Sequence, residues 1–292
     1  MKHTRSWANL AKGAALAGLL GVSMIASANA ASIVTITADP AGAGLSNAGP
    51  FSFNGIRTSD FSSINLTSTG GGGFSFTENG FLPIASFDPG NFTPPGLNGS
   101  IGATPYGLYI AFTATGSLST IAANTLQGSF SNVNFSFMGD AGFNSSFNHF
   151  DATHQVSCVG CGDDITLASG GLFPGGTNTV SINSASSPNP LPAAFVDLLF
   201  NATNGSFFTS PTAPFSVDLI SQFSNTPFVT NRFTTGVPSG VTEVVTIGTP
   251  AGQGGAGSGQ FVSTTVVPEP ASMAILGAGL VGLGLIRRRR RS

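Results

Sequence analysis

Charge is scarce in this chain, and positive charge is almost missing from its middle. Between residues 31 and 266 there is no lysine, and the two arginines, Arg57 and Arg232, face eleven acidic residues, which gives this stretch a net charge of −9. A surface without clustered lysine and arginine cannot neutralise phosphate groups. We therefore expect no nucleic-acid partner, and anionic lipid is an equally poor candidate.

The same stretch also lacks a sustained 3.6-residue hydrophobic period, which argues against helices. Instead, phenylalanine alternates with serine in Phe51–Phe53, Phe74–Phe76 and Phe135–Phe137. Such alternation places the rings on one face of a strand and the hydroxyls on the other. Frequent turn formers, Asn79-Gly80 among them, separate the strand candidates. The sequence predicts an all-β body over residues 31–266, folded as a single β-sandwich or jelly-roll-like domain.

Two segments of the body allow two interpretations each. The apolar run Phe195–Phe200 fits a strand or a helical turn, because periodicity does not separate the two over so short a length. The glycine-rich segment 252–259 reads as a flexible linker ahead of the C-terminal tail. It fits equally well a long hairpin loop that joins a strand at Val241–Ile247 to one at Phe261–Val266.

The N-terminus has the three parts of a secretory signal peptide. A basic segment precedes an apolar core at 14–26, which is too short to span a membrane. Small residues at Ala28 and Ala30 then supply a signal-peptidase site, so the mature chain is expected to begin at Ala31. The basic residues are Lys2, Arg5 and Lys12. Residues 1–30 are therefore predicted to be a signal peptide.

The C-terminus carries a second hydrophobic segment, with an ordered motif on each side. Residues 271–286 are uncharged and predict a single transmembrane helix, which long arginine side chains at its end help to span the bilayer. The five arginines that follow hold that end in the cytoplasm. The preceding motif is Val267, Pro268, Glu269 and Pro270, and the cluster is Arg287, Arg288, Arg289, Arg290 and Arg291.

The order of these features, over residues 267–292, resembles the PEP-CTERM sorting domain of Gram-negative bacteria. The resemblance implies export, transient anchoring in the inner membrane, and recognition by the membrane protease exosortase, with cleavage near the Pro-Glu-Pro. Release or transfer to the cell surface or exterior would follow. Genes of this kind tend to accompany exopolysaccharide production. The remainder of the chain carries no motif that assigns it to a family.

Cysteine is limited to Cys158 and Cys161, which follow His149 and His154 closely. Four such ligands within thirteen residues can hold zinc. An even cysteine count in an oxidising, exported compartment favours a local disulfide instead. We predict the disulfide, with neither a metal nor a cofactor.

Motifs for catalysis are few. There is no Gly-x-Ser-x-Gly elbow, and the scattered acids do not identify a catalytic pair. We therefore expect a non-catalytic cell-surface or extracellular-matrix protein, associated with exopolysaccharide or biofilm, in which Tyr106 and Tyr109 are candidates for sugar contacts. Two alternatives stay open. One is a secreted polysaccharide hydrolase and the other is a self-associating matrix protein. The hydrolase would use some of Asp140, Asp151, Asp163 and Asp164.

Overall fold

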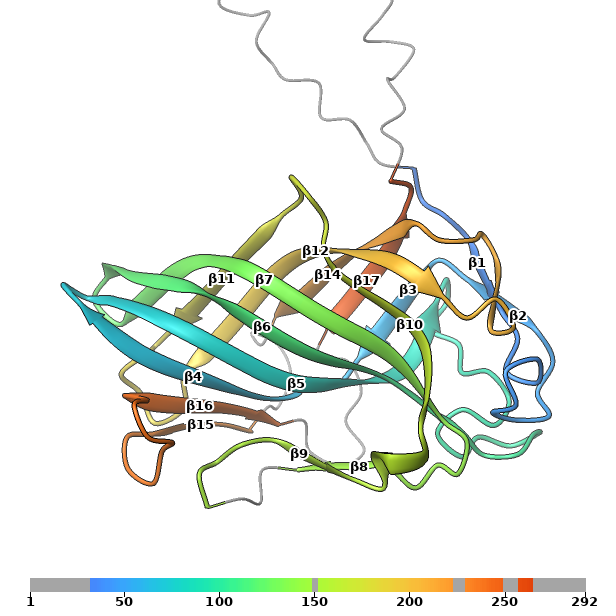
Figure 1. Cartoon of the computed structure of the whole chain (residues 1–292), viewed down its shortest axis with the longest axis horizontal. Helices are drawn as coiled ribbons and strands as arrows, with labels where there is room; N and C mark the ends of the chain where they lie inside the picture. Colours follow the sequence, from blue (N-terminus) through green and yellow to red (C-terminus); the bar gives the residue numbers. More distant parts are fainter. Residues whose placement is uncertain (1–31, 149–151, 223–228, 249–256, 265–292) are drawn as a thin grey trace, which may run out of the picture. The chain divides into compact units, whose positions relative to one another are not determined.

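The computed structural model describes residues 32–148, 152–222, 229–248 and 257–264 (Figure 1). Ile33–Thr264 form one compact unit. Its regular structure within these ranges is β-strand, apart from one turn of 3-10 helix, η1 (Cys161–Asp163). The all-β prediction is confirmed. The predicted signal peptide and the predicted helix at 271–286 lie outside the described residues, among which no helix is long and apolar enough to cross a bilayer.

The chain forms seventeen strands in the described residues, numbered here in the order of the sequence. Three of them, β5, β6 and β7, are much longer than the rest. The bounds are β1 (Ile36–Ala38), β2 (Phe51–Phe53), β3 (Gly55–Thr58), β4 (Phe61–Gly70), β5 (Gly73–Asp88), β6 (Gly107–Ala122), β7 (Thr125–Asp140), β8 (Ser146–Asn148), β9 (Ser157–Val159), β10 (Ile165–Leu172), β11 (Asn178–Asn183), β12 (Leu191–Thr203), β13 (Phe208–Ser210), β14 (Phe215–Gln222), β15 (Val229–Phe233), β16 (Glu243–Gly248) and β17 (Gly257–Val262).

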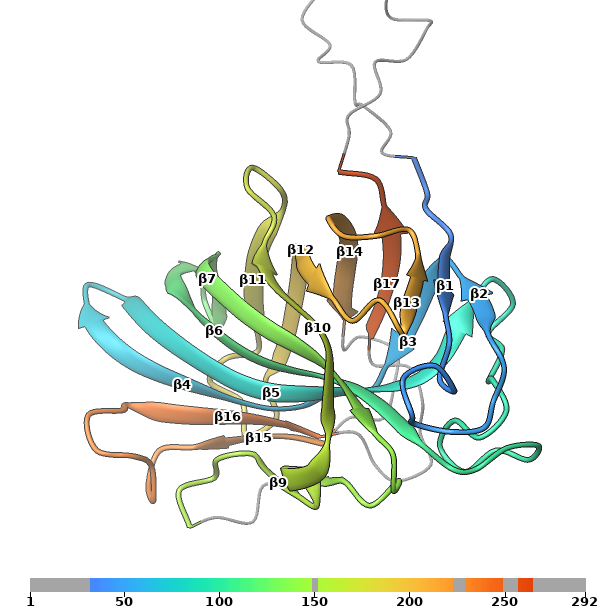
Figure 2. The same cartoon turned by 45° about the vertical axis from the view of Figure 1, so that its right-hand side comes forward.

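Twelve strands join into one antiparallel sheet whose pairing closes on itself (Figures 1 and 2). Starting from β5, the pairing runs through β6, β7, β11, β12, β14, β17 and β3 and returns to β5. Closure is possible because β5 is long: β4 pairs with its residues 73–81, and β3 continues along the same edge at residues 84–88, while β6 pairs with the opposite edge. The two facing layers that a sandwich would build from separate sheets thus belong to one curled sheet.

The enclosed face of this sheet holds a phenylalanine core. Phe200, on β12, stacks on Phe215 with ring centroids 4.8 Å apart, and it also contacts Phe135 at 4.8 Å and Phe261 at 5.8 Å. The ring is fully buried and links β12 to β7, β14 and β17. Burying such a ring stabilises the fold by about 1.5–3 kcal/mol. The alternating phenylalanines predicted to line one face of each strand are therefore the core.

The turn expected at Asn79-Gly80 is wrong, because both residues lie inside β5. Position 80 requires glycine because a neighbouring side chain occupies the space that a Cβ would need, and not because the chain turns there. A Cβ at this position would come within 2.4 Å of Cε1 of Phe112, whose ring lies over it on the enclosed face. Phe195–Phe200, for which a strand and a helical turn were both open, is part of β12.

The glycine-rich segment is also corrected where the structure describes it. Gly257–Gly259 belong to β17, which pairs with β3 and β14. The hairpin with β16, one of the two interpretations, is not formed by the described residues, since β16 pairs with β4 and β15. Glycine suits this strand because a Cβ at Gly259 would lie 2.9 Å from Cγ2 of Val217. The rest of the predicted linker, 252–256, lies outside the described residues.

Candidate functional site

A segment that follows β7 lies against the outer face of the sheet. We call residues 144–148 and 152–164 the strap; its strands β8 and β9 pair with each other. The ring of Phe147 stacks on Phe81 at 4.8 Å and packs on Tyr109 at 5.0 Å. The side-chain amides of Gln155 and Asn65 exchange two hydrogen bonds, of 2.8 and 3.0 Å. The strap is therefore fixed to β4, β5 and β6.

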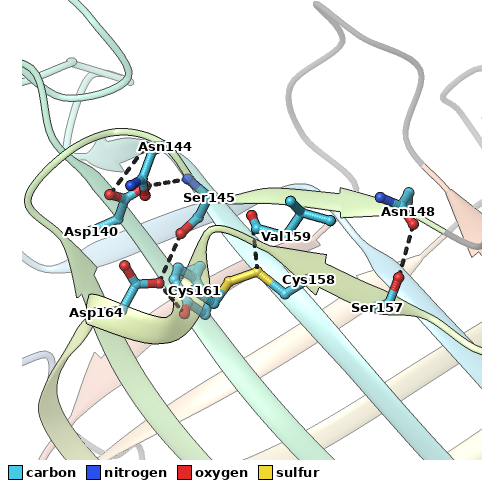
Figure 3. The surroundings of a disulfide bond; sticks show 10 residues. Asp140, Asn144, Ser145, Asn148, Ser157, Cys158, Val159, Cys161 and Asp164 are labelled. Atoms are coloured by element: carbon cyan, nitrogen blue, oxygen red, sulfur yellow. Dashed lines mark hydrogen bonds between the residues drawn. A yellow bond between two sulfur atoms is a disulfide. The ribbon is translucent and has the colours of Figure 1, made fainter.

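The two cysteines lie in this strap. Cys158 and Cys161 are joined by a disulfide, and no free cysteine is present (Figure 3). Of the two histidines considered as zinc ligands, His149 lies outside the described residues, while the ring of His154 stacks on Phe233 at 3.6 Å. Among the residues that the structure describes, no three His, Cys, Asp or Glu side chains group as a metal site would require.

Two of the four acids proposed for a hydrolase, Asp140 and Asp164, hold the strap in place. Asp140, almost fully buried, accepts a hydrogen bond from the backbone amide of Gly142 at 3.1 Å. It also accepts the backbone amides of Asn144 and Ser145, at 3.2 and 2.9 Å (Figure 3). Such bonds close a turn. Asp163 is exposed on η1, and Asp151 lies outside the described residues.

Asp164 connects the strap to the sheet. One of its oxygens accepts the hydroxyl of Tyr109 at 2.5 Å and the hydroxyl of Ser145 at 2.8 Å. Burial, and then this hydrogen bond to the carboxylate, raise the pKa of Tyr109 well above its ordinary value. Tyr106 and Tyr109 are only 0% and 3% exposed, so the expectation that they contact sugars is wrong: one is core and the other is covered by the strap.

Sequence reasoning missed a buried carboxyl pair on the enclosed face. Glu78, on β5, lines an interior cavity together with Asp60, which precedes β4. Burial, and next the charge of Asp60, raise the pKa of Glu78 to about 8. The signal was available, because Glu78 alternates in phase with the buried Phe76 and Leu82.

The interior cavity is small and mostly apolar. Its volume is about 60 Å³, and hydrophobic side chains such as Ile64, Phe112 and Val196 form most of its lining. A cavity of ~150 Å³ is what holds a benzene ring in an engineered protein core. The space beside Glu78 therefore has room for a few water molecules and not for a sugar ring.

A larger hollow lies on the opposite, outer face of the same strands. It measures about 380 Å³ and crosses β5, β6 and β7. Asn79, Thr113 and Asn134 are exposed there and stand side by side, since the strand register pairs Asn79 with Thr113 and Thr113 with Asn134. Phe81 of β5 and Val156 of the strap also line the hollow. We call it the outer groove.

Comparison with known proteins identifies the C-terminal tail. The model of the PEP-CTERM protein-sorting motif matches residues 266–291. No curated protein and no solved structure matches the chain. The match confirms the predicted resemblance and spans both Val267–Pro270 and Arg287–Arg291, which lie outside the described residues. A motif of this kind implies an exported protein, sorted by exosortase, that is held at the membrane transiently before it reaches the surface.

Proposed function

We propose that this exosortase-sorted chain is a non-catalytic protein of the surface or extracellular matrix of a Gram-negative bacterium, where it associates with exopolysaccharide. The observation that carries the proposal is the PEP-CTERM motif at residues 266–291. Signal peptidase removes residues 1–30 at the small side chains around Ala28, Ala30 and Ala31. Exosortase then acts on the tail from the outer side of the inner membrane.

The sequence of the tail is suited to holding the exported chain in the membrane for a limited time. We expect the predicted helix at 271–286 to stop in the membrane, because the arginine cluster that follows it prevents that end from crossing. Pro268 and Pro270 fix the backbone φ angle and remove two amide donors, so the segment around Glu269 stays outside the helix. We expect the protease to find an extended backbone there, at a fixed distance from the membrane surface.

The chemistry of the described residues supports a non-catalytic role. Asp140 and Asp164 are engaged in holding the strap. The pair with one raised pKa, Glu78 and Asp60, is what a hydrolase would need. However, it faces a cavity of about 60 Å³, too small for a saccharide. The outer groove, which is large enough, is lined by uncharged side chains.

Two features support a folded, soluble body over a self-associating material. A single cluster of buried side chains includes residues from strands all around the closed sheet. The curled sheet also leaves few strands without partners on both sides. A cooperative thermal transition is the expected behaviour of such a body, whereas dye-binding fibrils would indicate the self-associating alternative.

The sorting proposal is tested by removing the tail. The full chain and a chain truncated before Val267 are expressed in the producing bacterium, and both are located by fractionation with an antibody against the body. The full chain should be recovered outside the cell without its tail, as read by mass spectrometry of its C-terminal peptide, and should sediment with extracted exopolysaccharide. The truncated chain should be released into the periplasm and miss the surface.

Two tail variants compare loss of the Pro-Glu-Pro motif with a change that preserves the positive charge. Replacing Pro268, Glu269 and Pro270 by alanine should leave the protein anchored and uncleaved. Replacing Arg287–Arg291 by lysines keeps the positive charge, so it should leave membrane arrest unchanged. If the truncated chain reaches the surface as the full chain does, sorting by the tail is refuted.

A further inference from the structure

The outer groove is one end of a regular polar face. Along β5, β6 and β7, alternate residues point away from the core, and the strand register aligns them into rungs of three. Nearly all of these residues are exposed, while the residues between them, such as Phe76, Ala114 and Val133, are buried. The rungs are Ser75–Ser117–Ser129, Thr77–Thr115–Asn132 and Asn79–Thr113–Asn134.

The chemistry of these rungs is uniform. Every member is a hydroxyl or an amide, and none is charged, although the body as a whole has a net charge of −9. Hydroxyl and carboxamide groups each donate and accept hydrogen bonds. Neighbouring strands lie about 4.8 Å apart and alternate residues about 6.8 Å apart along a strand. The face therefore matches an uncharged polymer rich in hydroxyl groups, with a repeat that can meet successive rungs.

The groove adds a wall and an aromatic surface to this face. Val156 forms the wall, and Phe81 lies in the next rung beyond Asn79. Phe147 stacks on Phe81 with ring centroids 4.8 Å apart, and Tyr109 makes a T-shaped contact with Phe81 at a centroid distance of 6.0 Å, so the ring of Phe81 is held in place before any ligand arrives. A rigid site loses less conformational freedom on binding. An aromatic ring beside hydrogen-bonding groups suits the apolar face and the hydroxyl edge of a sugar.

We infer that the outer groove binds a segment of an uncharged polysaccharide, with Asn79, Thr113 and Asn134 hydrogen-bonding its hydroxyls and Phe81 packing against a sugar ring. This inference rests on the proposed association with exopolysaccharide and gives it a location. The groove takes the place of Tyr106 and Tyr109 as the expected site of sugar contacts, because both tyrosines are buried. A polyanionic chain is disfavoured, because the groove offers no cation and the body repels negative charge.

Binding is measured with the purified mature body and named probes. Cellohexaose and dextran represent neutral chains, and alginate represents a polyanion, in calorimetric titrations and affinity electrophoresis. The body should bind at least one of the neutral probes and should not bind alginate. The double variant Asn79→Ala/Asn134→Ala removes two neutral hydrogen-bonding groups and should weaken binding about tenfold.

A bulky substitution gives an independent test. Thr113→Trp fills the groove at an exposed strand position, where tryptophan is well tolerated. It should weaken binding by about tenfold or more. Thr209→Trp is the matched control, since Thr209 is exposed on β13 of the separate three-stranded sheet. Its affinity should equal that of the parent. Thermal unfolding of each variant establishes that it is folded.

The outcomes are separable from those of the sorting test. The inference is overturned if no neutral probe binds, if alginate binds as well as the neutral chains, or if Thr113→Trp and Thr209→Trp have equal effects. A groove that acts instead as a contact between two copies would show Thr113→Trp changing the oligomeric state and not glycan affinity. In each of these cases, sorting by the tail still stands, because surface delivery is scored without reference to the groove.

Discussion

The buried Glu78 should make the stability of the body depend on pH. Its side chain is 7% exposed and lines an apolar cavity beside Asp60, with Ser62 as a hydrogen-bond partner. Burial is the largest cause of its raised pKa, the charge of Asp60 is the second, and the bond with Ser62 acts in the opposite direction. The folded protein therefore binds a proton at this site more tightly than the unfolded chain does.

The sign and size follow from linkage between folding and proton binding. The pKa of Glu78 rises from 4.5 to about 8 on folding, so its full stabilising contribution is present below pH 4.5 and is lost as the pH rises toward 8. A shift of one unit corresponds to ~1.36 kcal/mol. Between pH 5 and pH 9 this residue should lower the free energy of unfolding by about 4 kcal/mol. Asp218 contributes in the same direction, because burial and then Asp197 raise its pKa.

The variant Glu78→Gln isolates this residue. Glutamine has nearly the shape of a protonated glutamate and does not ionise, so at pH 7 the variant should be more stable than the parent by about 3 kcal/mol. The difference should shrink below about 1 kcal/mol at pH 5. Urea unfolding of both proteins from pH 5 to pH 9 measures it. Asp163→Asn, at an exposed residue of η1, is the matched control for replacing a carboxylate by an amide.

Parallel pH profiles for the parent and Glu78→Gln would refute this reasoning, because they would mean that Glu78 titrates alike in the folded and unfolded chain. A variant that is less stable at every pH would also count against it. That result would show a requirement for the ionised carboxylate rather than a cost of burying it.

Two further predictions concern the disulfide and the core. Cys158 and Cys161 should resist alkylation unless reduced in protein recovered from the cell exterior, as read by mass spectrometry; two freely alkylated thiols with bound zinc would reverse this assignment. Phe200→Ala should cost about 3–5 kcal/mol in urea unfolding, because the ring is fully buried among other rings. Phe143→Ala, at a position 45% exposed, should cost much less, and equal losses would contradict the assigned core.

The local parts of the fold could be predicted from the sequence, since alternation of phenylalanine with serine is a property of neighbouring residues. Strand length was harder to predict. Asn79-Gly80 has the composition of a turn, yet tertiary packing of Phe112 over Gly80 keeps β5 continuous. The sequence-based prediction ends this strand before Asn79, so it misses residues 84–88, the part of β5 that closes the sheet by pairing with β3.

The closure and the groove could not be predicted, because both depend on pairing between distant residues. Gly55–Thr58 pair with Gly257–Gln260 across some 200 residues of chain, and no local signal selects that partner. The rung that joins Asn79 to Thr113 and Asn134 likewise needs the register of three strands. The burial of Glu78 could have been predicted, because Glu78 is separated from Phe76 and Leu82 by an even number of residues and so faces the same side of the strand.

The uncharged outer face is the feature that folding alone does not explain. Solvent-facing positions of an antiparallel sheet accept lysine, glutamate or aspartate without disturbing the core, and charge there favours solubility. This body carries acids at a turn, as with Asp140, on the enclosed face, as with Glu78, and on the outward side of β12 and β14, as with Asp197 and Asp218, but leaves the rungs of β5, β6 and β7 neutral. A neutral hydrogen-bonding surface avoids removing charges from water when a polyhydroxylated chain settles on it. The distribution of charge thus points to the same face as the groove does.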